Sequence, residues 1–353
     1  MTTRRRTPEP LHLIPTKQMR KGHGPLYQQL VERLAVSIST AETPQEKRIP
    51  SERDLAKLSG YSVITVKRAL HELELRGILT RQHGSGSFPL RKPSVQDLLA
   101  IASPQRLAVF NESLFHASTA LRYDLLYFLQ KMLAQSPTIL SLVDEEAISQ
   151  HDTFDGIFVI GRQAPKRLAT RRTKVFVGGP AGNSSADSIQ IDLDDAATKA
   201  TKFIQSLNGT TIYFFGSNSS ERPGGEALLQ RLTTRLPKDY KIISFFGSKE
   251  EVYVAAQQWL RHNHIPVLFF SAFYLCTGAL IRAAESIGRP LGKEIPLLAF
   301  GGNNTVFEDV VDLHVLTIDR EAMARAALEE ILLRIMAPGA PFRVRFIHGA
   351  SMT

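Results

Sequence analysis

The stretch that decides the fold of the first ninety residues is "PSERDLAKLSGYSVITVKRAL", residues 50–70. Ser51 and Ser62 are of the residue type that caps helix N-termini, and Gly60 between them is of the type that ends a helix. The stretch therefore predicts a short helix over 52–58 and a second helix that begins after Ser62. Two helices so close together are typical of a motif in which the first helix braces the second.

The flanking residues supply a further helix and a hairpin. Residues 25–38 place Leu and Ile side chains at helical spacing, and the helix that begins after Ser62 continues as far as Gly77. Beyond it, the β-prone runs 78–81 and 87–90 flank "HGSG", whose glycines permit the tight turn of a hairpin. Three helices followed by a hairpin define a winged helix-turn-helix, whose third helix enters the DNA major groove.

Positive charge is concentrated in this part of the chain. The 353 residues include 43 Lys and Arg against 34 Asp and Glu, a formal net charge of +9. Residues 1–95 hold 17 of the basic and 8 of the acidic residues, so the remaining chain is balanced at 26 of each. A surplus confined to the first quarter indicates an anionic partner there, either nucleic acid or an anionic membrane. Residues 1–23, which include Arg4, Arg5 and Arg6, are expected to form a disordered basic tail.

The predicted third helix has two distinct faces. One stripe is apolar and is expected to pack on the first two helices: Val66, Ala69, Leu70 and Leu73. The opposite stripe is expected to be exposed: Ile64, Arg68 and His71, with Lys67 at its edge. Taken singly, such cations are as readily solvated surface residues. Their coincidence with the charge surplus favours DNA binding, with Arg68 among the contacts.

The segments "PLYQQLVERL", "RIPSERDLAKLSGYSVITVKRALHELELRGIL" and "RQHGSGSF" resemble the GntR family of bacterial transcription regulators over residues 24–90. Carried over position by position, the resemblance implies these DNA contacts: Arg53, Ser62, Thr65, Lys67, His83 and Gly84. One departure is Val63, where the family often has a base-reading Arg. Valine can touch a thymine methyl group but cannot bond guanine, so the resemblance implies an operator that differs from the usual family sites.

From Arg106 onward, strand-like and helix-like runs alternate after a connector over 91–104 that carries "SVQDLLAIA". That segment is compatible with a short helix but reads mainly as a linker. Ten strands are expected, at 106–111, 138–143, 155–161, 174–179, 188–192, 211–217, 241–247, 266–271, 296–302 and 315–319. Six helices fall between them, at about 116–135, 194–206, 222–234, 250–262, 275–287 and 321–336. The pattern predicts two doubly wound α/β lobes with a ligand cleft at the carboxyl ends of the strands.

Side chains just past the strand ends are the candidate effector contacts: Ser113, Asp192, Arg222, Phe273 and Asn303. Arg222 at a predicted helix start is the strongest of them, because a guanidinium beside helix-start amides favours a carboxylate, a phosphate or a hydroxyl-rich ligand. A plain surface arginine is the alternative. Asp192 is as readily a residue that caps the start of the next helix.

The order of motifs over 105–349, among them "DGIFVIG", "SSERPGGEALL" and "PLLAFGGN", resembles the effector domain of LacI/GalR regulators, which has a periplasmic-binding-protein-like fold. The arginine that sugar-binding members usually carry matches Arg222, but Phe273 and Gly301 stand where they often carry Asp. Loss of those carboxylates weakens the case for a simple sugar and leaves sugar derivatives open. The segment between the second and third strands is also short for a crossover helix, so the first lobe is expected to be trimmed there.

Other classes of protein find less support in the sequence. Cys276 is the one cysteine, which indicates a reducing cytoplasm and a buried thiol. No secretory leader or run long enough to span a bilayer is evident, and metal-ligand spacings are absent, with "HNH" at 262–264 interpreted as a solvated loop. An α/β enzyme with a basic head and a solute-binding protein remain alternatives. Neither a catalytic set nor a cofactor motif stands out.

The sequence thus predicts a bacterial transcription regulator, expected to be a repressor. Its predicted parts are a tail over 1–23, a winged helix-turn-helix over 24–90, a linker over 91–104 and a two-lobed α/β effector domain over 105–353. The expected partners are a near-palindromic double-stranded operator, a small-molecule effector such as a sugar or sugar derivative, and a second copy of the chain.

Overall fold

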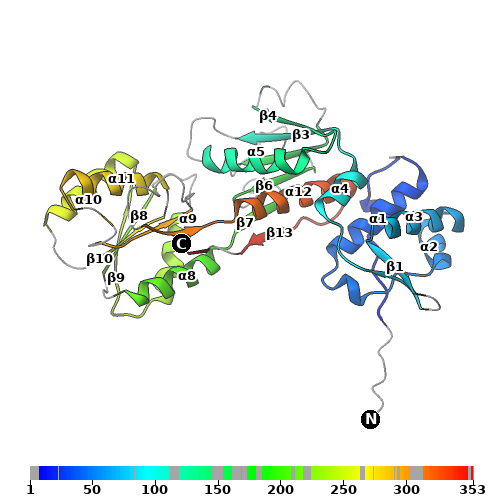
Figure 1. Cartoon of the computed structure of the whole chain (residues 1–353), viewed down its shortest axis with the longest axis horizontal. Helices are drawn as coiled ribbons and strands as arrows, with labels where there is room; N and C mark the ends of the chain where they lie inside the picture. Colours follow the sequence, from blue (N-terminus) through cyan, green and yellow to red (C-terminus); the bar gives the residue numbers. More distant parts are fainter. Residues whose placement is uncertain are drawn as a thin grey trace, which may run out of the picture. The chain divides into compact units, whose positions relative to one another are not determined.

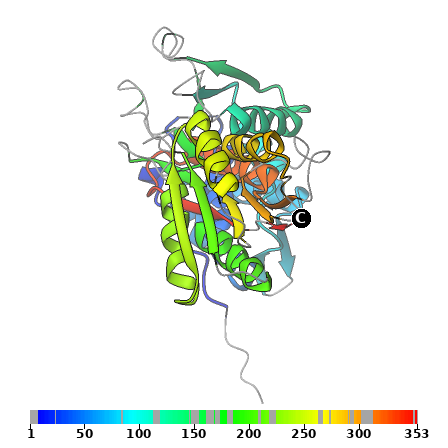
Figure 2. The same ribbon diagram turned by 90° about the vertical axis from the view of Figure 1, so that its left-hand side faces the viewer.

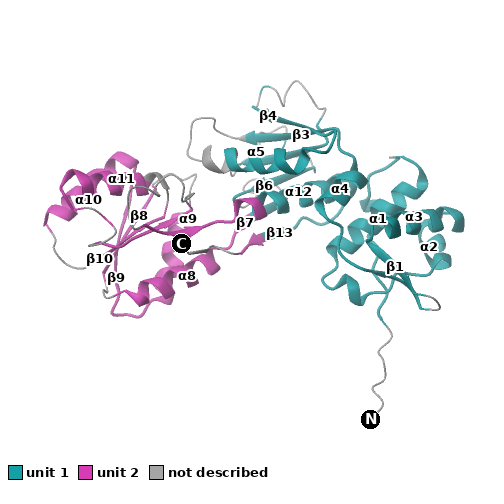
Figure 3. Ribbon diagram, viewed as in Figure 1, with its two compact units in different colours: residues 1–189, 323–345 teal, residues 190–322, 346–353 magenta. Residues whose placement is uncertain are grey.

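The chain forms two compact units in the computed structural model, one made of residues 1–189 and 323–345 and the other of residues 190–322 and 346–353 (Figure 3). The structure describes residues 8–22, 24–82, 85–111, 119–144, 146, 154–160, 168, 173–179, 185–207, 211–217, 224–262, 267–272, 274–289, 291, 295–301, 313–348 and 351–352. The chain passes from one unit to the other after residues 189, 322 and 345.

The first unit begins with the predicted three helices and hairpin. The helices are α1 (Leu26–Thr40), α2 (Glu52–Ser59) and α3 (Val63–Leu75), with a 3-10 turn η2 (Pro44–Glu46) between α1 and α2. The hairpin consists of β1 (Leu79–Gln82) and β2 (Gly86–Pro89), which pair antiparallel. A single apolar core holds them together, because Leu30, Leu55 and Leu70 from the three helices are each at most 1% exposed. We call residues 26–89 the head.

Residues 8–22, which the sequence analysis assigned to a disordered tail, are folded against the head. They run in an extended course, interrupted by the 3-10 turn η1 (Thr16–Gln18), and Leu11 is buried in the head core. The backbone of Glu9 and Leu11 pairs with Arg48. We call residues 8–22 the strap.

The connector after the head is also a packed element. Helix α4 (Val95–Ala102) begins at Ser94, whose hydroxyl caps the helix while the Asp97 carboxylate reaches back to the Ser94 amide. Val95, Leu98, Leu99 and Ala102 are buried, which gives α4 one apolar face. The segment is thus the short helix that the sequence left open, and its capping box and apolar spacing specify it.

A six-stranded sheet follows in the first unit, with the order β13-β7-β6-β5-β3-β4. Its strands are β3 (Arg106–Asn111), β4 (Ile139–Val143), β5 (Gly156–Ile160), β6 (Lys174–Val177), β7 (Asp187–Ile191) and β13 (Val344–Ile347). Strands β4, β3, β5, β6 and β7 pair parallel in that order. Helices α5 (Thr119–Leu133) and α12 (Arg320–Met336) pack beside this sheet (Figure 1).

The second unit has its own six-stranded sheet, with the order β14-β12-β11-β10-β8-β9. Its strands are β8 (Thr211–Gly216), β9 (Lys241–Phe246), β10 (Val267–Ser271), β11 (Leu297–Phe300), β12 (Leu313–Thr317) and β14 (Ser351–Met352). Helices α8 (Leu193–Ser206) and α9 (Gly224–Arg235) cover one face, and α10 (Lys249–His262) and α11 (Tyr274–Ser286) cover the other (Figures 1 and 2). Separate apolar clusters fill the two interfaces.

The α/β class, the two doubly wound sheets and the ten expected strands are confirmed, with ends that differ by a few residues. The short strands β13 and β14 were not predicted. Cys276 is buried, at 2% exposure. Among the described helices, none is both long and apolar enough to cross a membrane. No group of three or more His, Cys, Asp or Glu side chains in the described ranges is placed to hold a metal ion.

Candidate nucleic-acid interface

Two serine caps and one glycine set the geometry of the turn between α2 and α3. The Ser51 hydroxyl accepts the Asp54 amide at 3.2 Å and the Ser62 hydroxyl accepts the Thr65 amide at 3.1 Å, so each helix begins where the sequence predicts. Gly60 ends α2 with φ of +75°, a left-handed conformation that suits glycine. The local residues thus define where α2 ends and where α3 begins.

Helix α1 holds this turn from behind. The Tyr61 hydroxyl donates to the Gln29 side chain at 3.1 Å, and the buried Arg33 donates to the carbonyl oxygens of Leu58 and Ile14. Burial lowers the pKa of the Arg33 guanidinium, which still remains protonated at neutral pH because arginine titrates so far above it. These contacts anchor the end of α2 and the turn after it to α1.

The two faces of α3 separate as predicted. The apolar stripe is buried: Val66, Ala69, Leu70 and Leu73. The opposite side is exposed, and Ile64 has 81% of its surface accessible. An exposed isoleucine at the start of such a helix is suited to the thymine methyl group in the major groove. Val63 beside it is 40% exposed, so both apolar side chains lie at the end of α3 that would enter DNA first.

Three cations of the predicted set are on this surface. Lys67 lies 3.9 Å from the Glu52 carboxylate with its side chain 61% exposed, a loose pair that a phosphate can displace. Arg53 is exposed on the first turn of α2. Arg68 is exposed too, but its guanidinium carbon lies 3.8 Å from the centre of the Tyr27 ring, so a cation–π contact directs it toward α1.

The structure adds two basic residues that sequence reasoning missed. Arg81 of β1 lies 3.8 Å from Glu52 and 3.2 Å from Glu74, which joins the hairpin to α2 and α3. The Arg48 side chain lies against Gly86, where an added Cβ atom would be 2.8 Å from its Nε atom. Neither has a spacing that distinguishes it from other surface cations. Of the predicted wing contacts, His83 and Gly84 lie outside the described residues.

Most of the predicted effector contacts also lie outside the described residues: Ser113, Arg222, Phe273 and Asn303. Asp192 is described, and it caps α8. Its Oδ1 atom accepts the amides of Asp194 and Asp195 at 2.9 and 3.0 Å, and its Oδ2 atom lies 2.6 Å from Nδ1 of His348. The geometry therefore supports the helix-capping role of Asp192. The His348 ring on Oδ2 is exposed, so a ligand group can replace it there.

Comparison with known proteins finds two different resemblances in this chain. Residues 26–88 match the bacterial regulatory proteins of the gntR family. The histidine utilization repressor of Pseudomonas putida is 38% identical over 71 residues, which are 20% of this chain and 29% of that protein. The HTH-type transcriptional repressor NagR of Bacillus subtilis is 36% identical over 90 residues, 26% of this chain and 35% of that protein. The chain thus spans about a third of these curated relatives.

Solved structures match a larger share of the chain. A sugar-binding transcriptional regulator of the LacI family from Enterococcus faecalis is 15% identical, with a TM-score of 0.58, and the match covers 70% of this chain and 95% of that chain. The Cra transcriptional dual regulator from Pseudomonas putida, in complex with fructose 1-phosphate, is 14% identical with a TM-score of 0.55, covering 70% and 97%.

The class follows from these two matches and the geometry together. The chain has a gntR-family helix-turn-helix domain at residues 26–88, followed by two parallel-sheet lobes with the fold of LacI-family effector-binding domains.

Proposed function

We propose that this protein is a transcriptional repressor that binds an operator through the head and senses a small molecule through the two α/β lobes. The observation that carries the proposal is the surface at the start of α3. There, exposed apolar and cationic side chains lie on α2 and α3, within the quarter of the chain that holds the whole charge surplus. The two repressors named above, which resemble the head, support the same direction of control.

The proposed DNA contacts follow the resemblance and the exposed face: Arg53, Ser62, Thr65, Lys67, Arg68, His83 and Gly84. Ser62 and Thr65 lie at the N-terminal turn of α3, which faces the groove in this class of protein. Their hydroxyl groups share a hydrogen bond of 2.9 Å. The proposed parts are a DNA-binding domain over 24–90, a connector over 91–104 and an effector domain over 105–353. A DNA partner implies that the protein works in the cytoplasm.

The effector is proposed to be a sugar derivative with an anionic group. Arg222 would supply the cation, and Ser113, Asp192, Phe273 and Asn303 would supply polar or stacking contacts. The Pseudomonas putida regulator of similar fold binds a sugar phosphate, which supports this class of ligand. Asp192 would join the site by exchanging its contact with His348 for a ligand hydroxyl group. No specific observation favours the α/β enzyme alternative.

A homodimer is proposed because a near-palindromic operator needs two heads. Large apolar side chains are exposed on α5 and on the edge strand β4: Tyr123 and Tyr127 at 61%, Ile139 at 60% and Leu142 at 48%. Exposed apolar groups of this size are typical of a protein interface. Sedimentation of the full chain and of Tyr127→Glu tests this, since a charge in a dimer core should yield monomers.

The decisive experiment is selection of genomic fragments by the purified full chain, followed by titration of the selected duplex at several salt concentrations. Each phosphate contact should contribute a slope of about −0.9 to the logarithmic salt dependence. We expect tight binding that weakens steeply as salt rises. Absence of a selected fragment at low salt, or binding that does not change with salt, would rule out the proposed function.

A further inference from the structure

The strap is bound to the head along its first two thirds, and near its C-terminal end it joins the head to other parts of the first unit. The N-terminal end of the strap pairs with the backbone of Arg48. The Arg48 amide donates to the Glu9 carbonyl at 2.8 Å, and the Leu11 amide donates to the Arg48 carbonyl at 2.7 Å. The adjacent Ile49 amide donates to Ser87 of β2 at 2.9 Å. The first third of the strap is therefore part of the wing side of the head.

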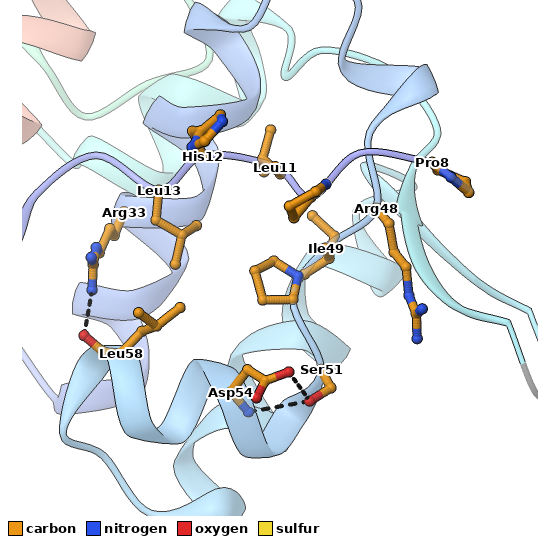
Figure 4. A pocket seen from close by; sticks show the side chains of 12 residues that line it. Pro8, Leu11, His12, Leu13, Arg33, Arg48, Ile49, Ser51, Asp54 and Leu58 are labelled. Atoms are coloured by element: carbon orange, nitrogen blue, oxygen red, sulfur yellow. Dashed lines mark hydrogen bonds between the residues drawn. The ribbon is translucent and has the colours of Figure 1, made fainter. Parts of the chain in front are cut away.

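The middle of the strap is held by α1. The Ile14 amide donates to the Ser37 hydroxyl at 3.0 Å, and Nε of Arg33 donates to the Ile14 carbonyl at 2.7 Å. The strap residues Leu11 and Leu13 line a groove of about 590 Å³, and Figure 4 shows Leu13 pointing toward Leu58 of α2. Both backbone polar groups of Ile14 are thus satisfied by side chains of one helix, which fixes the course of the strap along it.

The last contact joins three elements at Arg20. Its guanidinium bonds the Glu32 carboxylate of α1 at 3.0 and 2.5 Å, and it also donates to the Ala102 carbonyl at the end of α4 at 3.1 Å. Its amide donates to the Met336 carbonyl at the end of α12 at 2.9 Å. The side chains of Arg20 and Glu32 are 14% and 4% exposed, so water screens this ion pair little.

A second backbone contact supports the same junction. The Gly339 amide donates to the Gln18 carbonyl at 2.9 Å. The approach requires a glycine, because a Cβ atom added at position 339 would lie 2.7 Å from the Cα atom of Gln18. The strap therefore closes on the loop after α12 with backbone touching backbone.

That loop is itself locked to the sheet of the first unit. The buried Arg334 bonds the Asp187 carboxylate of β7 at 2.6 and 2.7 Å and the Ala340 carbonyl at 2.7 Å, and the Arg343 amide donates to Asp187 at 2.9 Å. These residues lie on the segments that lead into the second unit after positions 189 and 345. A shift of those segments would consequently reach the strap.

We propose that Arg20 is a positioning residue that clamps the DNA-binding head to the first α/β sheet, so that the head and this sheet move as one body. The inference rests on the proposed function, in which two heads must hold a set separation on one operator. Bivalent binding is tight when the geometry lets both heads engage together, and it is lost when the heads are misplaced. The clamp thus converts a movement of the sheet into a change of head spacing.

The test compares two duplexes with four proteins. The duplexes are the operator selected by the wild-type chain and the same duplex with one half-site scrambled. For Arg20→Ala we expect a loss on the order of 10–100-fold on the full operator, with binding to the half-site within about twofold of wild type. Unchanged binding to the full operator would overturn the proposal. An equal loss on both duplexes would also overturn it, because Arg20 would then support the fold of the head.

A variant outside the head covers the case in which Arg20→Ala leaves the buried Glu32 unpaired and unfolds the head. Gly339→Ala forces the strap away from the loop after α12 and leaves the head residues intact. Gly179→Ala is its matched control, because a Cβ atom there would meet nothing within 4 Å. We expect Gly339→Ala to repeat the selective loss on the full operator and Gly179→Ala to bind like wild type. A Gly339→Ala protein that binds like wild type would contradict the clamp.

A measurement without DNA keeps this inference separate from the proposed function. Spin labels at the exposed positions Lys57 of α2 and Lys131 of α5 report the distance from the head to the first sheet. We expect a narrow distance distribution in the wild-type chain and a broad one in Arg20→Ala and Gly339→Ala. A broad distribution in the wild-type chain would overturn the clamp whether or not an operator is found.

Discussion

On α3, the buried residues stabilise the head, whereas the exposed residues are available for contact with DNA. Leu70 and Leu73 are at most 1% exposed and hold the three helices together, whereas Ile64 is 81% exposed and contributes nothing to the core. A single exposed apolar residue is ordinary on a protein surface, so the proposed role of Ile64 depends on its place at the start of α3 and not on its exposure alone.

Lys67 and Arg53 give the first test at this scale. Each has its cationic end in solvent, so Lys67→Ala and Arg53→Ala should weaken operator binding by about 1–3 kcal/mol each. The free energy of unfolding should change by no more than about 0.5 kcal/mol, since neither side chain is buried. Binding isotherms and urea denaturation measure the two quantities. Lys57→Ala, an exposed lysine near the end of α2, is the control, and an equal loss from it would point to a general charge effect.

Glu52 gives the second test, because it is an anion beside two candidate phosphate contacts. It lies 3.9 Å from Lys67 and 3.8 Å from Arg81, and its side chain is 32% exposed. Glu52→Gln removes repulsion of phosphates and should raise affinity for non-specific DNA a few-fold. It should also destabilise α2 by about 0.3–1 kcal/mol, because a negative charge in the first turn interacts favourably with the positive end of the helix dipole.

The comparison for this substitution is Glu42→Gln, which removes the same charge from an exposed turn after α1. If the gain in non-specific affinity were equal in both variants, net charge rather than the position of Glu52 would explain it. Filter binding to a scrambled duplex at fixed salt provides the measurement.

At the scale of elements, local signals predicted the head well and distant pairings escaped prediction. The caps at Ser51 and Ser62 and the glycine at position 60 act within a few residues, so the sequence pattern suffices for α2 and α3. The strap depends on Gly339 and Met336, which lie at the other end of the chain, and no local pattern indicates such a contact.

The candidate sites divide in the same way. The exposed stripe of α3 follows from helical periodicity, but the stacking of Arg68 on Tyr27 and the place of Arg81 between two carboxylates depend on how α1 and the hairpin pack on α3. The strand β13 escaped because it has only four residues, Val344–Ile347, which form neither a longer apolar run nor a strict alternation of apolar and polar residues.

The connector helix α4 gives the prediction for acid stability. Burial acts to raise the pKa of Asp97, but hydrogen bonds from Arg91 and Ser94 outweigh it and leave the pKa below its usual value. A carboxyl group with a lowered pKa in the folded state stabilises the protein above its unfolded pKa of about 4, and that stabilisation is lost as pH falls through the folded value.

Asp97→Asn should therefore lower stability at pH 7 by about 1 kcal/mol, the usual worth of a helix cap, and should lose less on acidification than wild type does. Urea unfolding at pH 7 and pH 3 measures both quantities. Asp239→Asn, in an exposed turn of the second unit, serves as the control and should keep the pH dependence of wild type. A variant that loses as much stability as wild type between the two pH values would contradict the assignment.

At the scale of the whole molecule, the N-terminal quarter and the two α/β lobes differ in charge and in fold, in keeping with their different proposed roles. Residues 1–95, which include the strap and the head, carry the surplus of basic residues, and the two lobes have the doubly wound sheets in which ligands bind at the carboxyl ends of strands. Such a division requires that ligand binding and DNA binding be separable by mutation, although linkage couples their free energies.

Arg222→Ala tests that separation in the full chain. A ligand present at about 100 times its dissociation constant stabilises its protein by about 2.7 kcal/mol, which a thermal-shift screen of sugar phosphates and sugar acids detects. We expect a rise in melting temperature with one of these compounds for wild type, and none for Arg222→Ala. Operator affinity without ligand should be equal in both proteins, because the substituted residue is outside the head. Arg261→Ala, which removes an exposed arginine from α10 of the same unit, should keep the response. A response that survives in Arg222→Ala would exclude this arginine as the effector anchor, whereas a loss of operator affinity would show that the two activities are not separable there.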